Sequence, residues 1–302
     1  PECARQARVL PRPIGPVNLP RLRRLQLDTS WGELTVVGGS RAGEGTLILL
    51  PQLHLALDGG RAHRALPAMT TLLVSHGHVD HLGGVAYWAS QRQLQSMGPA
   101  RLLAPRAIAA AVAGLLATHA RLGGGERYEV EVLAVEAGER HRVRRDIDLV
   151  FYPTDHWVTT LGSRLLWRRH RLLPELAELS GEEIARRRSA GETVTEEIEA
   201  NLLAYCADSG PGVLQDQPEA LSAEVVLIEC SFYRPGDRER AARFGHMHIE
   251  DLLAALERLS CRHLVLLHAS RRHRLREVEA ILDERLRPHL DCSLHHLMID
   301  WD

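Results

Sequence analysis

Short apolar runs separated by glycine turns open the chain. Residues 25–60 contain four such runs, each with the length and composition of a β-strand. The apolar run at 71–74 predicts a fifth, buried strand. Helices and strands alternate further on, with predicted helices at 85–94 and 107–120 and predicted strands at 100–105 and 128–135. Strands alternating with helices predict an α/β fold in which helices are layered on sheets.

The chain shows no repeat and no long low-complexity tract, so we predict one domain. Residues 1–24 are rich in Pro and Arg and are expected to be an irregular N-terminal segment. Residues 25–302 are long enough to form a single domain with a sizeable core. A segment rich in Arg and Glu at about 164–200 is expected to be a helical insertion within it.

The amino-acid composition limits where the protein is expected to work and which partners it is expected to bind. The formal net charge is −2 and lysine is absent, which argues against a generally basic nucleic-acid binder but leaves room for a local Arg patch. Five Cys without a C-x-x-C pair are typical of reduced thiols, so a cytoplasmic location is expected. No apolar run approaches the length of a membrane span, and no membrane partner is expected.

Candidate chemistry begins directly after the predicted strand at 71–74. The sequence there is Ser-His-Gly-His-Val-Asp-His, which places His76, His78, Asp80 and His81 within six residues. Imidazoles and a carboxylate at this density suit a borderline divalent cation such as Zn²⁺. The alternative, a polar loop that happens to be His-rich, does not account for the H-x-H-x-D-H spacing.

The H-x-H-x-D-H spacing after a strand resembles the metal-binding motif of the metallo-β-lactamase superfamily. The resemblance implies an α/β (α+β) fold with four layers, the αββα sandwich. It also gives a role to Asp58, which otherwise looks like a turn residue before two glycines. In the superfamily an Asp at this point supports the metal-binding loop from behind the ligands.

Three more candidate ligands each follow an apolar strand, namely His156, Asp208 and His268. Side chains at strand ends are expected to converge on one edge of the sheets. We therefore expect two Zn²⁺ ions, with Mn²⁺ or Fe as alternatives. One site would be formed by His76, His78 and His156, the other by Asp80, His81 and His268, with Asp208 bridging them.

Two later segments, A-E-V-V-L-I-E-C-S-F and A-A-R-F-G-H-M-H, narrow the resemblance to ribonuclease Z, the tRNA 3′-processing endonuclease. Carried over to this chain, Glu229 orients His246, and His246 donates a proton to the leaving oxygen. Asp80 would serve as metal ligand and as the base that orients water. The expected substrate contacts are His248, Ser270 and Arg272.

The resemblance implies a dinuclear zinc phosphodiesterase that cleaves RNA at tRNA 3′ ends by metal-hydroxide attack. Precursor tRNA is then the expected partner, and a homodimer is expected from the resemblance alone. In the family the insertion grips the tRNA, whereas the mixed Arg and Glu residues of this insertion fit an ordinary solvated helix pair equally well. Departures from the family pattern spare the ligands but change their neighbours: Thr159-Thr160 follows His156, and His273 stands where the family has Tyr. The fold and chemistry are therefore better founded than tRNA as the substrate.

Three alternatives stay open from the sequence. The same site could act on a small-molecule or cyclic-nucleotide phosphodiester. It could also be a lactone or thioester hydrolase, although metal-assisted ester hydrolysis needs no pair such as Glu229 and His246. The third alternative is an RNA-binding protein with a vestigial metal site, which the presence of all seven ligands disfavours.

Overall fold

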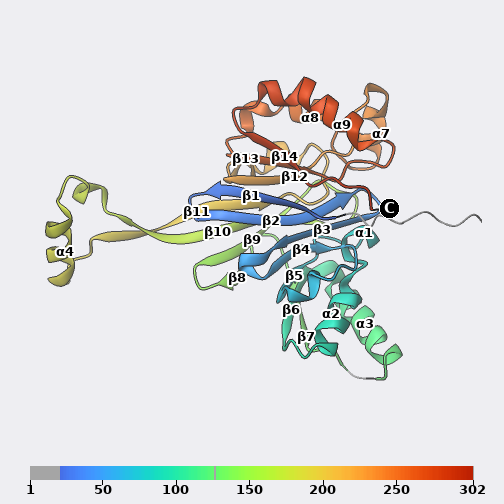
Figure 1. The fold of residues 1–302 in the computed structure, drawn as a ribbon, viewed down its shortest axis with the longest axis horizontal. Coiled ribbons are helices and arrows are strands. Elements are labelled where there is room, and N and C mark those ends of the chain that lie inside the picture. The colour runs from blue at the N-terminus through green and yellow to red at the C-terminus, as the bar shows by residue number, and fades with distance from the viewer. Residues whose placement is uncertain (1–20, 126, 302) are drawn as a thin grey trace, which may run out of the picture.

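The computed structural model describes residues 21–125 and 127–301, which form two seven-stranded sheets (Figure 1). The first sheet follows the chain in order, with antiparallel pairing from β1 to β4 and parallel pairing from β4 to β7. Its strands are β1 (Arg23–Thr29), β2 (Gly32–Arg41), β3 (Gly45–Leu50), β4 (Leu55–Gly59), β5 (Thr71–Leu73), β6 (Ala100–Pro105) and β7 (Val130–Val135). Of the predicted irregular segment 1–24, residues 1–20 lie outside the described part of the chain. Strand β1 begins at Arg23, two residues before the predicted start of the domain at residue 25.

The second sheet has the order β14-β13-β12-β11-β10-β9-β8. Pairing is antiparallel from β8 to β11 and parallel from β11 to β14, so both sheets combine an antiparallel half with a parallel half. Its strands are β8 (Arg140–Arg144), β9 (Ile147–Pro153), β10 (Leu161–Leu172), β11 (Thr195–Tyr205), β12 (Val225–Glu229), β13 (His263–Leu267) and β14 (Ser293–His296).

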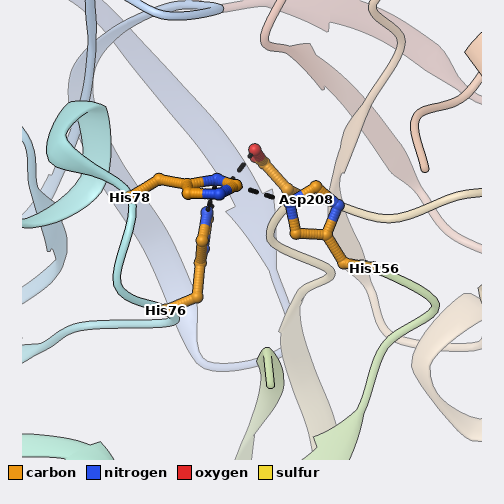
Figure 2. Close-up of side chains that lie close together, drawn as sticks. All are labelled: His76, His78, His156 and Asp208. Carbon is orange, nitrogen blue, oxygen red and sulfur yellow. Dashed lines mark hydrogen bonds and ion pairs between the residues drawn. The ribbon is translucent and has the colours of Figure 1, made fainter. Parts of the chain in front are cut away.

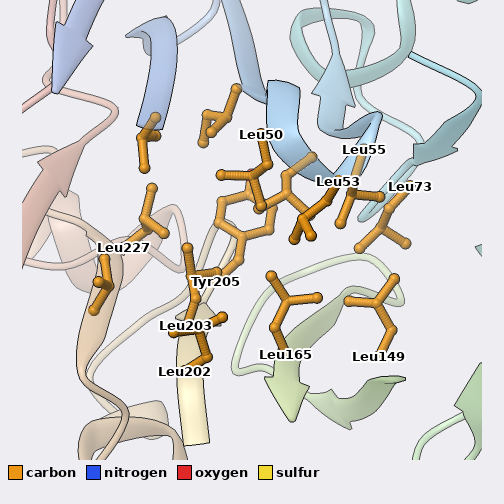
Figure 3. Close-up of a cluster of buried hydrophobic side chains, with 14 of the residues drawn as sticks. Leu50, Leu53, Leu55, Leu73, Leu149, Leu165, Leu202, Leu203, Tyr205 and Leu227 are labelled. Carbon is orange, nitrogen blue, oxygen red and sulfur yellow. The ribbon is translucent and has the colours of Figure 1, made fainter. Parts of the chain in front are cut away.

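Apolar side chains fill the space between the two sheets. Leu50 and Leu55 from the first sheet meet Leu165 and Leu203 from the second, and the ring of Tyr205 lies among them (Figure 3). All five side chains are buried. The alternation of inward and outward residues along the strands therefore produces the inner layer of the sandwich.

Helices cover the outer faces of both sheets. The α-helices are α1 (Val79–Leu82), α2 (Val85–Leu94), α3 (Arg106–Leu122), α4 (Gly181–Ser189), α5 (Val213–Asp216), α6 (Pro218–Leu221), α7 (Arg238–Arg243), α8 (Ile249–Leu253) and α9 (Leu275–Ile281). Helices α2 and α3 pack on the first sheet, and α8 and α9 pack on the second (Figure 1). This arrangement confirms the predicted αββα sandwich. None of the helices in the described residues is long and apolar enough to span a membrane.

The segment at about 164–200 differs from its prediction. Strands β10 and β11 leave the sandwich as a two-stranded ribbon that carries α4 at its far end; we call this ribbon and its tip the arm (Figure 1). The prediction of a helical insertion is therefore wrong for both flanks, and only the tip is helical. Opposite charges face each other across the ribbon, as in the 2.6 Å pair of Arg171 and Glu196, and such cross-strand pairs stabilise a sheet where the sequence alone favours a helix.

Candidate metal centre

The first group of candidate ligands lies on the turn between β5 and α1. His76 and His81 are fully buried, Asp80 is nearly so, and His78 is exposed at the rim. The turn packs closely on the end of β4, because a Cβ on Gly60 would lie only 1.8 Å from the backbone oxygen of Asp80. Glycine at position 60 is thus required to bring the turn against the sheet.

The other three ligands come from the second sheet. His156 follows β9, Asp208 follows β11 and His268 follows β13, and all three strands end at the same edge of the molecule. Figure 2 shows His156 and Asp208 pointing toward His76 and His78 from the opposite side of the site. The structure therefore brings together the seven side chains that the sequence singled out as ligands.

The backbone is unusual at this edge. Asp58, Ala207 and His268 have positive φ angles of 60°, 50° and 62°. They account for three of the five non-glycine residues with positive φ in the described parts of the chain. Such conformations cost free energy and persist where the surrounding structure enforces them, which is typical of functional sites.

Distances between the ligand atoms suit metal binding. The donor atoms of His76, His78, His156 and Asp208 lie within 4.8 Å of one another, and so do those of Asp80, His81 and His268. Individual separations are 3.0 Å for His76 Nε2 to His78 Nδ1 and 3.3 Å for His268 Nε2 to Asp80 Oδ2. Ligands ~2.0–2.1 Å from a tetrahedral zinc lie about 3.3 Å apart, so these separations match a coordination shell.

Asp208 lies between the two groups. One oxygen is 3.2 Å from His81 Nε2, and the other is 3.3 Å from His268 Nε2 and 3.8 Å from His76 Nε2. Burial favours the protonated form, yet the imidazoles of His268 and His81 hold the pKa of Asp208 well below its ordinary range. An ionised carboxylate shared by two groups of imidazoles is the donor arrangement that a pair of cations requires.

Four of the candidate ligand imidazoles each have a second partner at Nδ1. His156 Nδ1 donates to the carbonyl oxygen of Gly245 at 3.0 Å, and His81 Nδ1 donates to Asp58 at 2.7 Å. His76 and His268 have Ser75 and Ser231 beside their Nδ1 atoms, at 3.0 and 3.2 Å. These partners fix the tautomer that turns the Nε2 lone pair toward the centre.

Asp58 connects several of these contacts. Its carboxylate accepts hydrogen bonds from the backbone N–H and hydroxyl of Ser75, from His81 and from the hydroxyl of Tyr205. Burial alone would lower the pKa of His81, but Asp208 and Asp58 raise it well above its ordinary value. The two carboxylates therefore favour a positive charge between His81 and Asp208, which a cation bound by Nε2 of His81 would supply.

Glu229 and His246 form a dyad at the end of β12. The carboxylate of Glu229 is fully buried and lies 2.6 Å from His246 Nδ1. It also accepts from the backbone N–H of Ser209 and the hydroxyl of Ser231, at 2.9 and 2.7 Å. Burial lowers the pKa of His246, but Glu229 outweighs it and raises the pKa to about 9. The ring is therefore protonated at neutral pH, and one of its nitrogens lies close to Asp208 and His268.

The expected substrate contacts divide into two groups. Ser270 and Arg272 line a cavity of about 560 Å³ together with His78, His156 and His246, and we call it the site cavity. The expectation for His248 is wrong. Its ring is fully buried, its Nδ1 accepts from the backbone N–H of Glu250 at 3.2 Å, and its Nε2 lies 2.9 Å from the carbonyl oxygen of Arg234. His248 therefore caps the N-terminus of α8 through a local contact, and its Nε2 contact with Arg234 holds the ring away from the site cavity, which the sequence spacing cannot reveal.

Sequence reasoning missed the residues that support the ligands. Ser75 precedes the first ligand, so its position next to the motif is the one signal that could have identified it. Ser231 and Tyr205 carried no signal, because their contacts with His268 and Asp58 join segments far apart in the chain. The backbone N–H of Gly43, which donates to Asp80 at 2.7 Å, has no side-chain signature at all.

Comparison with known proteins places the chain in a family. Residues 23–269 match the family model of the β-lactamase superfamily domain. The chain is 29% identical over 248 residues to tRNase Z TRZ1 of Arabidopsis thaliana, which covers 81% of this chain and 88% of the relative. It is 28% identical over 251 residues to the chloroplastic tRNase Z TRZ2 of the same plant, which covers 82% of this chain and 71% of the relative.

Solved structures show the same fold at low identity. The metallo-β-lactamase fold protein YhfI from Bacillus subtilis superposes with a TM-score of 0.57 at 16% identity, over 85% of this chain and 93% of that one. Zn²⁺-bound PqqB from Methylobacterium extorquens gives a TM-score of 0.54 at 16% identity, over 86% of this chain and 97% of that one. With the family match over most of its length and the same sandwich in these structures, the chain belongs to the metallo-β-lactamase superfamily.

Proposed function

We propose that this protein is a dinuclear zinc phosphodiesterase, and that it cleaves RNA at tRNA 3′ ends as a ribonuclease Z-type endonuclease. The observation that carries the proposal is the buried pair of Glu229 and His246 beside the two groups of ligands. Hydrolysis of a phosphodiester releases an alkoxide, which needs a proton. A protonated imidazole held beside the metal ligands is suited to supply it.

The chain's own groups have distinct tasks in this reaction. Bound at the two sites, zinc ions would activate water at neutral pH and neutralise charge on the phosphate. Glu229 holds Nδ1–H of His246, which leaves the second ring nitrogen free to donate its proton to the departing oxygen. The carboxylate of Asp80, fixed by the N–H of Gly43, orients the attacking water.

Similarity to tRNase Z TRZ1 supports RNA as the substrate class. The arm supports it less directly. Arg186 and Arg187 at its tip pair with Glu183, whereas Arg188 makes no ion pair with any residue that the structure describes. Helix α4 buries none of its residues, so its side chains are free to contact a partner. In the proposed complex the arm contacts the tRNA body while the site cavity receives its 3′ end.

A test uses the zinc-loaded protein and a tRNA precursor with a 3′ extension. The proposal predicts a single cut at the 3′ side of the mature tRNA, lost after chelation and restored by Zn²⁺ or Mn²⁺. Bis(p-nitrophenyl) phosphate, assayed in parallel, reports the phosphodiesterase chemistry without the RNA. Failure to hydrolyse either substrate contradicts the proposal as a whole.

A second candidate follows from the size of the site cavity. At about 560 Å³ it lies within the range of small-ligand pockets, so a small or cyclic-nucleotide phosphodiester would also fit. Hydrolysis of bis(p-nitrophenyl) phosphate with the tRNA precursor left intact would favour this candidate over the endonuclease.

A further inference from the structure

Two large aromatic side chains stand exposed at the mouth of the site cavity. Trp157 is 65% exposed and Phe244 is 39% exposed. Their rings are stacked, with centroids 5.9 Å apart and planes inclined by 17°. Each adjoins a residue of the centre, since Trp157 follows His156 and Phe244 lies two positions before His246. An exposed aromatic patch beside the polar residues of a cavity is typical of a surface that contacts a ligand.

The backbone holds Trp157 in place despite its exposure. Gly245 has a φ of +60°, and a Cβ on it would lie 2.6 Å from Cδ1 of the indole. The carbonyl oxygen of Gly245 accepts the hydrogen bond from His156 Nδ1. One glycine therefore seats the indole and positions a metal ligand, so the orientation of Trp157 is coupled to the geometry of the centre.

Two cationic side chains lie against the Phe244 ring of this pair. The guanidinium groups of Arg240 and Arg243 lie 5.3 and 5.6 Å from the centroid of the Phe244 ring. Neither forms an ion pair with an acidic side chain in the part of the chain that the structure describes, and Arg240 lines the site cavity. Aromatic faces flanked by free Arg side chains form the surface on which proteins stack the bases of single-stranded nucleic acids.

We propose that Trp157 and Phe244 form a stacking platform for a nucleobase next to the phosphate that is cleaved. The substrate class is then a nucleotide-containing phosphodiester with an unpaired base, and simple alkyl phosphodiesters lack the group that the platform recognises. The inference rests on the proposed function for its phosphate chemistry. It adds the requirement that the substrate carry a nucleobase. Glu229, His246 and the metal ligands act on the phosphate group and do not explain such a requirement.

The test compares two ligands that differ only in the base, adenosine 5′-monophosphate and ribose 5-phosphate. Their dissociation constants are measured by isothermal titration calorimetry on the zinc-loaded protein, so no turnover is needed. The wild type should bind the nucleotide about tenfold more tightly. Trp157→Ala and Trp157→Leu should bring the ratio of the two dissociation constants close to one. Trp157→Phe keeps an aromatic face and should retain most of the preference for the nucleotide.

Leu122→Ala serves as the control, because Leu122 is 79% exposed on α3 and does not line the site cavity. It should leave the ratio unchanged. Equal affinities in the wild type, no measurable nucleotide binding, or a preference that survives Trp157→Leu would each overturn the platform. A wild-type protein that hydrolyses no phosphodiester but still binds adenosine 5′-monophosphate more tightly than ribose 5-phosphate, in a way that depends on Trp157, would contradict the proposed function. It would still support the stacking platform.

Discussion

The imidazole of His246 lies between a buried carboxylate and the metal ligands, and this position allows its role to be tested by the choice of leaving group. We predict that His246→Ala lowers the cleavage rate of an RNA phosphodiester by about 10²–10⁴-fold, because the departing alkoxide loses its proton donor. Bis(p-nitrophenyl) phosphate should be affected far less, since nitrophenolate leaves without protonation. Rate measurements on both substrates give the comparison, and equal losses on the two would refute a proton-donor role.

In the proposed mechanism, Glu229 sets the pH range in which His246 can donate a proton. Because its pKa is raised to about 9, the imidazole stays protonated at neutral pH and loses its proton as the pH rises through that value. Activity on RNA should therefore fall on the alkaline side near pH 9. Glu229→Gln removes the carboxylate that raises the pKa of His246, while burial still lowers this pKa. The alkaline fall in activity should therefore move to lower pH by about one unit or more. A profile of kcat/KM against pH with an unmoved alkaline limb would exclude this coupling.

In the proposed site, Asp58 acts through its hydrogen bond with His81 and not on the substrate. Asp58→Asn keeps the size of the side chain but removes the negative charge that holds His81 Nδ1–H. We expect the affinity for zinc to fall by about 10–100-fold, as for other residues that orient metal-bound His. Tyr205→Phe removes one hydrogen bond to the same carboxylate and should have a smaller effect. Zinc competition with a chromophoric chelator measures both, and a larger loss in Tyr205→Phe would contradict this order.

At the scale of elements, periodic patterns predicted the regular parts of the fold well. Helix α2 spans the predicted residues 85–94 and β6 the predicted 100–105. Gly84 marks the start of α2, and Pro99 and Pro105 mark the two ends of β6. The flanks of the arm could not be predicted in this way. Their Arg and Glu residues favour a helix locally, and the strand pairing that outweighs this preference joins β10 to β11 across some twenty intervening residues.

The arm offers a prediction at the same scale. Leu172 and Thr195 are paired directly in the ribbon, so replacing residues 173–194 with Asn-Gly would close β10 and β11 as a hairpin. We expect the sandwich and the hydrolysis of bis(p-nitrophenyl) phosphate to be retained. Helix α4 buries no residue, and the two buried residues of the deleted segment, Leu176 and Val194, belong to none of the hydrophobic clusters that pack the two sheets. Affinity for precursor tRNA should drop by at least about tenfold, or ~1.4 kcal/mol. Unchanged tRNA binding in a filter-binding assay would show that the arm has no part in recognition.

At the scale of the whole molecule, the site exists because strands from both sheets end at one edge of the sandwich. The sequence predicted this convergence for His156, Asp208 and His268, since each follows an apolar strand and the motif at His76 supplied the partner. It could not identify Ser231, whose contact with His268 joins distant segments, and it could not show that the ring of His248 is buried beside Arg234 and not at the substrate. The pairing of Trp157 with Phe244 was equally hidden, because the two residues belong to different loops brought together by the fold.

We propose that the strand ends of both sheets, at this one edge of the sandwich, together hold two metal ions. The most direct test of this proposal is the zinc content of the protein after loading with excess Zn²⁺ and desalting, measured by inductively coupled plasma mass spectrometry. The seven side chains and the shared carboxylate of Asp208 predict about two zinc ions per chain. Asp208→Ala, which removes the ligand common to both groups, should retain fewer. A wild-type protein that retains no zinc would contradict the account.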